Sequence, residues 1–141
     1  MKNYKNYRVE IKSLTKDKNF PIIIDEEGNN VSRLKNVINH KITAKFFGDL
    51  FKNEKNFCIK IISQYIKSLS KIFKDLGINI NTIPVLDVLR KNTNNIIGNR
   101  SFSKNKKIVK EIGELTIKNL HFNKIAGVIK HIPGHGAATA D

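Results

Sequence analysis

The sequence has very little cysteine and no long apolar run. Its single cysteine, Cys58, cannot form an internal disulfide, which argues against a disulfide-stapled secreted scaffold and agrees with a reducing compartment. No apolar stretch approaches the roughly 18 residues that a transmembrane helix needs, and the opening residues, MKNYKNYRVEIK, lack the apolar core of a signal peptide. We therefore expect a cytoplasmic protein that does not span a membrane.

Acidic residues are also scarce. Lys and Arg number 26 against 12 Asp and Glu, which gives a formal net charge of +14. Such a charge in isolation suggests a nucleic acid or another anionic partner. The basic residues, however, are mostly lysines scattered along the whole chain, and the richness in lysine, isoleucine and asparagine indicates an AT-rich coding sequence. Because dispersed charge is typical of a solvated surface, a small basic nucleic-acid-binding protein is the alternative and not the favoured hypothesis.

The 141 residues, 40% hydrophobic and 27% charged, have the length and composition of one globular domain. Apolar spacing predicts helices at 7–16, 44–51, 53–76 and 107–120, and strands at 22–24, 78–86 and 125–129. The helix at 53–76 has the clearest three-and-four spacing, and Gly77 follows it as a left-handed cap. Because helices separate the strands, the strands must run in one direction with right-handed crossovers. The sequence therefore predicts an α/β fold with a parallel sheet.

Charged or polar residues follow each predicted strand. Asp25 follows the first strand, Asp87 the second, and Lys130 with His131 the third. In parallel α/β folds the ligand lies beyond the carboxyl ends of the strands, where their loops converge. The sequence thus predicts a binding site at this end of the sheet, close to the long polar loop 90–107.

The last twelve residues, KHIPGHGAATAD, are the most informative segment. Pro133 and two glycines around His135 require a tight, irregular path that lets a ligand approach closely. His131 and His135 without a third ligand are a weak metal signal, and the glycines lack the Gly-Lys-Ser/Thr of a phosphate loop. An ordinary strand-to-helix loop would leave the clustering of Lys, His and Asp unexplained.

This segment resembles a signature of the bacterial β-N-acetylhexosaminidases of glycoside hydrolase family 3. Three upstream segments resemble the same family in the same order: PIIIDEEGNNVSRL resembles its strand-plus-DQEGGxVxR segment, NTIPVLDV its APVLDV strand, and IGNRSF its GxRSF loop. The four matches span about residues 19–141. Any one of them could arise by chance, but the ordered series is hard to dismiss.

The resemblance implies a partial TIM (β/α)8 barrel, with about strands 2 to 4 and their helices. It also implies a glycosidase that removes terminal β-linked N-acetylglucosamine by a retaining mechanism, from muropeptides during peptidoglycan recycling in the cytoplasm. The implied partner is therefore an amino-sugar glycan or muropeptide, with no cofactor and no metal. A β-glucosidase of the same family is disfavoured because such enzymes generally lack the PGHG-to-Asp loop.

Site residues are carried over by position. The resemblance assigns substrate binding to Asp25, Arg33, Arg100, Lys130 and His131, and the loop to Pro133, Gly134, His135 and Gly136. It assigns Asp141 to the aspartate that polarises an acid/base histidine two residues later. A carboxylate partner raises the basicity of the imidazole and fixes its tautomer. Asp87 is expected to shape the strand end and not to touch the substrate.

Two departures from the family pattern stand out. Gly28-Asn29-Asn30 replaces the usual Gly-Gly-Arg, although asparagine tolerates left-handed backbone better than most residues. The acid/base histidine and the nucleophilic aspartate are not among the 141 residues. We therefore expect residues 1–141 to be an incomplete glycoside hydrolase family 3 N-terminal domain, inactive alone. Such a piece exposes an apolar face and sheet edges, and it is expected either to aggregate or to depend on a complementary fragment.

Overall fold

The computed structural model describes residues 2–38, 41–90 and 95–136. The helices are α1 (Lys2–Thr15), α2 (Ala44–Asn53), α3 (Lys55–Leu76) and α4 (Lys106–Phe122), and a 3₁₀ turn covers Gly98–Arg100. The strands are β1 (Ile23–Ile24), β2 (Ile80–Asn81) and β3 (Ala126–Gly127). None of the described helices is both long enough and apolar enough to span a bilayer.

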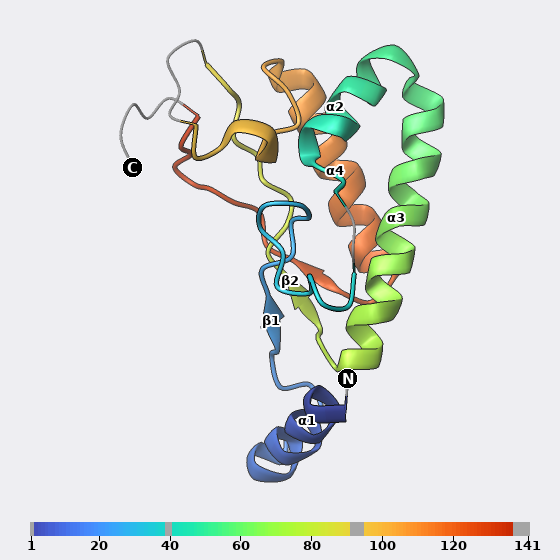
Figure 1. Ribbon diagram of the computed structural model, residues 1–141, viewed down its shortest axis with the longest axis vertical. Coiled ribbons are helices and arrows are strands. Elements are labelled where there is room, and N and C mark those ends of the chain that lie inside the picture. The colour runs from blue at the N-terminus through green and yellow to red at the C-terminus, as the bar shows by residue number, and fades with distance from the viewer. Residues whose placement is uncertain (1, 39–40, 91–94, 137–141) are drawn as a thin grey trace.

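The three strands form one parallel sheet in the order β1-β2-β3. Ile23 pairs with Ile80, which in turn pairs with Ala126. Helices α2, α3 and α4 contact one another and lie to one side of the sheet (Figure 1). The predicted α/β class and parallel sheet are therefore confirmed.

The predicted strand at 78–86 is wrong in its extent, because β2 covers only Ile80–Asn81. Pro84 lacks an N–H group and cannot donate to a ladder, as expected for a proline at an irregularity. Pairing resumes beyond it as a single parallel bridge between Val85 and Lys130. There the Lys130 N–H donates to the Pro84 carbonyl at 3.1 Å, and the Leu86 N–H donates to the Lys130 carbonyl at 2.6 Å. Between the Ile80–Ala126 pair and this bridge the chain after β2 therefore holds one residue more than the chain after β3, so pairing resumes with its register shifted by one.

Helix α3 supplies much of the core, as its spacing predicts. Its buried apolar side chains are Cys58, Ile62, Ile66, Leu69, Phe73 and Leu76. Gly77 ends the helix in the left-handed conformation at a φ of 82°, which confirms the predicted cap. Burial in this apolar layer raises the pKa of the Cys58 thiol to about 11, so the thiol is protonated and packs as an apolar group.

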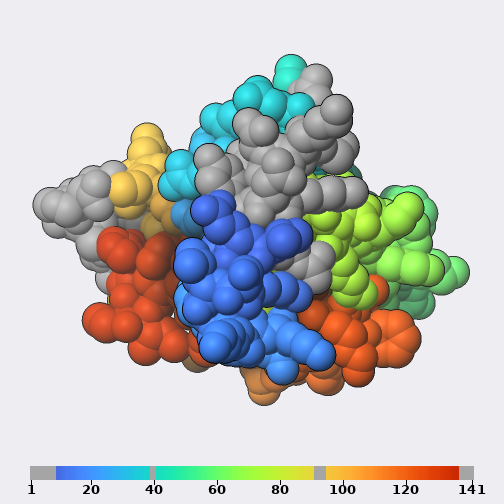
Figure 2. Space-filling view, turned by 90° about the horizontal axis from the view of Figure 1, so that it is seen from below, coloured from blue at the N-terminus to red at the C-terminus, as the bar shows by residue number. Residues whose placement is uncertain are grey.

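The two ends of the sheet differ in what lies beyond them. Helix α1 lies at the end where β1 begins (Figure 1), and the blue N-terminal segment lies across the middle of this end, beside the red C-terminal segment (Figure 2). Polar loops lie at the opposite end, beyond the carboxyl ends of the strands. The predicted site residues that the structure describes are therefore on the loop side.

An apolar groove of about 510 Å³ lies beside α4 and the outer strand β3. Its apolar lining includes Leu86, Val88, Val109, Ile117 and Ile129. Ile129 is 46% exposed, and Lys106, Lys110 and Lys118 flank the groove. This surface agrees with the expectation of an uncovered apolar face.

Candidate functional site

Three strand ends meet in a network of charged side chains. Lys130, beyond β3, places its Nζ 2.5 Å from the Asp25 Oδ1, just beyond β1. Thr82, directly after β2, donates its hydroxyl to the same Asp25 oxygen at 2.6 Å, and its own oxygen accepts from Lys130 at 3.1 Å. The predicted convergence of strand ends is thus present at Asp25 and Lys130.

Glu27 joins this network to the loop that carries Arg100. One oxygen of Glu27 lies 2.6 Å from the Lys130 Nζ. The guanidinium of Arg100 donates to both Glu27 oxygens, from Nε at 2.8 Å and from Nη2 at 2.9 Å. Such a bidentate pair fixes both position and orientation. Glu27 is therefore the carboxylate that holds the two cations beside Asp25.

The network favours the charged forms of Asp25 and Arg100. Burial raises the pKa of Asp25, but the hydrogen bonds from Lys130 and Thr82 outweigh it and hold that pKa below the ordinary value. The hydrogen bonds to Glu27 raise the pKa of Arg100 further above neutrality. The site therefore presents the ionised Asp25 carboxylate as an acceptor close to the charged Arg100 guanidinium.

Arg33 is held less firmly than the other predicted contacts. Its Nη2 lies 3.8 Å from the Asp25 Oδ2, and its side chain is 67% exposed. The backbone around it is fixed by Glu26, whose buried Oε2 accepts from the Ser32 hydroxyl and the Arg33 N–H, each at 2.9 Å. The Arg33 side chain thus lies mostly exposed at the margin of the network, on a backbone that Glu26 anchors.

The departure from the family pattern at residues 28–30 leaves the turn intact. Gly28 has a φ of 96° and Asn29 a φ of 43°, both in the left-handed region. Asparagine is among the residues that tolerate this region. Asn29 thus adopts the left-handed backbone that asparagine is expected to tolerate.

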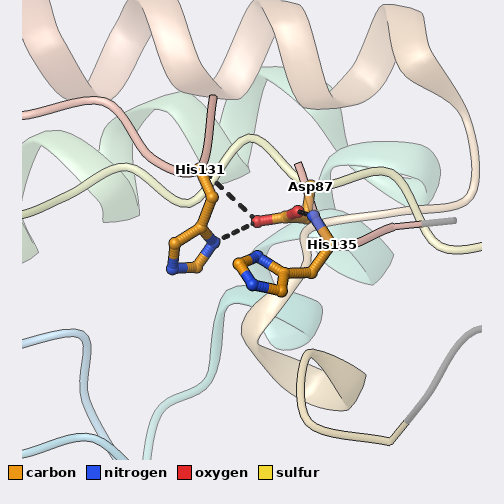
Figure 3. A group of neighbouring side chains, drawn as sticks. All are labelled: Asp87, His131 and His135. Atoms are coloured by element: carbon orange, nitrogen blue, oxygen red, sulfur yellow. Dashed lines mark hydrogen bonds and ion pairs between the residues drawn. The ribbon is translucent and has the colours of Figure 1, made fainter. Parts of the chain in front are cut away.

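Asp87, His131 and His135 form a second cluster beside this network (Figure 3). The Asp87 Oδ2 lies 2.6 Å from the His131 Nδ1, and the two imidazole rings meet edge to face with centroids 4.6 Å apart. The other oxygen, Oδ1, accepts from the backbone N–H groups of His135 and Gly136. Burial raises the pKa of Asp87, but these hydrogen bonds outweigh it and lower that pKa below its ordinary value.

The donor atoms of this cluster lie within 4.8 Å of one another, close enough to consider a metal ion. Both oxygens of Asp87 already accept hydrogen bonds, which leaves one nitrogen from His131 and those of His135. Protein zinc sites use three or four protein ligands. The described cluster offers one ligand atom from each of its three residues, and in the structure hydrogen bonds join these residues.

The PGHG loop follows its tight path because it packs against the backbone after β2. A Cβ added at Gly136 would lie 2.2 Å from the Val88 carbonyl oxygen, and one at Gly134 would lie 2.8 Å from the Asp87 Oδ1. Glycine is thus required by close approach at both positions. Pro133, Gly134, His135 and Gly136 are all described, whereas Asp141 lies outside the described residues.

The structure brings Asp25, Arg100 and Lys130 together, with His131 adjacent in the chain and Arg33 at the margin. Sequence reasoning missed Glu27, although it stands next to the quoted glycine of the DEEG segment. It also missed Thr82, which the sequence places inside the predicted strand 78–86 and which follows β2 only in the structure.

The model of the glycosyl hydrolase family 3 N-terminal domain matches residues 5–141. The chain belongs to this family. This match to a glycosyl hydrolase domain favours the glycosidase hypothesis over the nucleic-acid-binding alternative.

Curated beta-hexosaminidases match most of the chain. Beta-hexosaminidase A of Pseudoalteromonas piscicida is 32% identical over 126 residues, which are 85% of this chain and 20% of that protein. A beta-hexosaminidase of Stenotrophomonas maltophilia is 26% identical over 120 residues, which are 85% of this chain and 35% of that protein. The chain therefore spans about a fifth to a third of the length of these curated relatives.

Solved family 3 structures share the fold. NagZ from Neisseria gonorrhoeae in complex with N-trifluoroacetyl-D-glucosamine is 28% identical, with a TM-score of 0.86. That match covers 96% of this chain and 40% of the NagZ chain. The expectation of a partial TIM-barrel-like α/β domain is therefore confirmed.

Proposed function

We propose that this chain forms the sugar-binding part of a glycosidase that removes terminal β-linked N-acetylglucosamine, with muropeptides of cytoplasmic peptidoglycan recycling as the substrate class. The observation that carries the proposal is the network in which Glu27 holds Lys130 and Arg100 beside Asp25. The beta-hexosaminidase relatives and the NagZ complex with an N-acylated glucosamine support an amino sugar as ligand.

The chemistry of the network suits a sugar. Each hydroxyl of a pyranose both donates and accepts a hydrogen bond, and charged partners make the stronger bonds. Asp25 would accept from one hydroxyl, while Lys130 and Arg100 would donate to others. Arg33, exposed beside Asp25, would close over the ligand, and His131 would contact a further hydroxyl.

We place the bond-breaking groups outside the described residues. A retaining glycosidase needs a nucleophile and an acid/base group roughly 5 Å apart. Asp25 and Glu27 are each engaged in ion pairs, and Asp87 is enclosed by N–H donors. The proposal assigns Asp141 to the partner of the acid/base histidine, and assigns that histidine and the nucleophile to further polypeptide. Residues 1–141 alone would then cleave no chromogenic N-acetylglucosaminide.

A complementary polypeptide would complete the site, and the apolar groove beside α4 is the surface we assign to it. Apolar side chains line this groove, and three lysines together with Glu114 flank it, so an amphipathic helix fits its chemistry. A second copy of this chain fits less well, because the formal net charge of each copy is +14.

Sugar binding to the chain itself tests the proposal. We would follow backbone amide shifts by NMR while adding N-acetylglucosamine to wild type, Lys130→Met and the control Lys67→Met, an exposed lysine on α3. Lys130→Met should weaken binding roughly ten-fold or more, since a hydrogen bond to a charged group is worth about 1.5–3 kcal/mol. Wild-type shifts that avoid residues 25–33 and 100, or an equal loss in Lys67→Met, would count against the proposal.

A further inference from the structure

Asp87 is a fully enclosed carboxylate that the proposed sugar contacts do not include. Its side chain is 0% exposed. Its oxygens accept from the ring Nδ1 and backbone N–H of His131 and from the N–H groups of His135 and Gly136. Its carbonyl oxygen accepts from the Ser101 hydroxyl at 2.6 Å. One residue thus joins the chain after β2, the loop before α4 and the segment after β3.

The contact with His131 determines where that ring carries its proton. A carboxylate that is ionised can only accept hydrogen bonds, so the nitrogen that faces it must carry the hydrogen. The neutral ring of His131 therefore has its proton on Nδ1, 2.6 Å from the carboxylate, and a lone pair on Nε2. Figure 3 shows Nε2 on the side of the ring away from Asp87.

We propose that Asp87 is a positioning residue that makes His131 a hydrogen-bond acceptor toward the sugar. Lys130 and Arg100, which lie near His131, can only donate hydrogen bonds. An acceptor on His131, in addition to Asp25, lets the site recognise a second donating hydroxyl of the sugar. A sugar hydroxyl that donates to Nε2 would be selected, and an ether or deoxy position would be disfavoured. This inference rests on the proposed function for the identity of the ligand, but the state of the ring does not depend on it.

Replacing Asp87 by asparagine should move the ring proton of His131 from Nδ1 to Nε2. The asparagine oxygen can accept from the N–H groups of His135 and Gly136, which turns its NH₂ group toward the His131 Nδ1. Nδ1 must then accept, and the ring proton moves to Nε2. The substitution keeps the size of the side chain, so its effect reports hydrogen-bond direction and not lost packing.

Gly136→Ala is the control for displacement of the loop. Its added Cβ would meet the Val88 carbonyl oxygen at 2.2 Å, so it shifts the loop backbone while the Asp87 carboxylate that faces the His131 ring keeps its chemistry. His121, on α4, provides an internal reference signal in the same spectra.

The experiment is long-range ¹H–¹⁵N NMR of the histidine rings in the full chain at about pH 8, above the ordinary histidine pKa of about 6.5. Wild type and Gly136→Ala should show the proton on Nδ1 of His131, and Asp87→Asn should show it on Nε2. In parallel titrations, Asp87→Asn should bind N-acetylglucosamine about ten-fold more weakly than wild type, because an acceptor has become a donor.

Wild-type His131 with its proton on Nε2 overturns the inference, even if Asp87→Asn fails to fold. An unchanged ring state and unchanged sugar affinity in Asp87→Asn, with only a lower melting temperature, shows a purely structural role and also overturns it. If the ring proton moves to Nε2 in Asp87→Asn as expected but wild type binds no sugar, the positioning of His131 by Asp87 is supported. The proposed sugar site is then wrong.

Discussion

The strand-end network and the α3–α4 layer are held together in opposite ways. In the network, Asp25, Glu27, Arg100 and Lys130 are tied by ion pairs that cross from strand to strand. The α3–α4 layer packs apolar side chains such as Phe73 and Ile112, each 0% exposed. Apolar burial is nondirectional and large, whereas ion pairs are directional and contribute little net stability. We infer that the layer supplies the stability and the network supplies the geometry.

The largest expected effect is on the layer. Phe73→Ala should lower the free energy of unfolding by about 3–5 kcal/mol, because it opens a cavity in a fully buried site. Urea denaturation measures it, with Phe57→Ala, a half-exposed position on the same helix, as control. A loss below about 1 kcal/mol in Phe73→Ala would contradict the division between layer and network.

This division also explains what the sequence could predict. The spacing of the helix at 53–76 agrees closely with α3 at Lys55–Leu76, because a repeating apolar face determines a helix. The strand at 78–86 was predicted too long, because the apolar run continues through Pro84 although its paired backbone does not. Periodicity therefore predicts the layer better than the strand ends.

Within the site, sequence motifs predicted which segments meet but not which side chain makes each contact. Asp25, Glu26 and Glu27 are consecutive, yet Asp25 faces Lys130, Glu26 is buried against the Ser32 hydroxyl, and Glu27 bridges two cations. Their directions depend on the turn at Gly28 and Asn29, which local sequence alone does not determine. The sequence predicts that Asp87 shapes the strand end. It does not predict that the Asp87 carboxylate contacts the His131 ring.

Glu27→Gln is the sharper test of the network. The change leaves Lys130 and Arg100 without their shared negative partner, and the Glu27 side chain is only 6% exposed. We expect a loss of about 3 kcal/mol in unfolding free energy, since breaking a buried ion pair leaves an uncompensated charge. The control is Glu111→Gln, which removes a half-exposed pair with Lys55 and should cost about 1 kcal/mol or less. Equal losses in the two variants would mean that Glu27 is no anchor.

Acid should weaken the network before it weakens the layer. The pKa of Asp25 is lowered in the folded chain, so its stabilisation is present above the unfolded value of about 3.9 and is lost as the pH falls through the lower folded value. Asp25→Asn should therefore flatten the decline in stability below about pH 4. Melting temperatures between about pH 6 and pH 2.5 measure it, with Asp49→Asn on the exposed side of α2 as the control for lost charge. An unchanged slope in Asp25→Asn would show that its ion pair with Lys130 does not form in solution.

The smallest effect on stability is expected at the apolar groove beside α4, where a substitution should change binding more than it changes stability. Ile129→Thr should change the unfolding free energy by about 0.5 kcal/mol or less, because the side chain is already 46% exposed. The same change should weaken association with the remaining part of the Stenotrophomonas maltophilia beta-hexosaminidase, added as a separate polypeptide and followed by calorimetry. Val9→Thr, on α1 at the opposite end of the sheet, alters an exposed apolar side chain away from the groove and should leave association intact. If Ile129→Thr and Val9→Thr bind equally well, the groove is not where the barrel is completed, and the apolar lining beside α4 needs another partner.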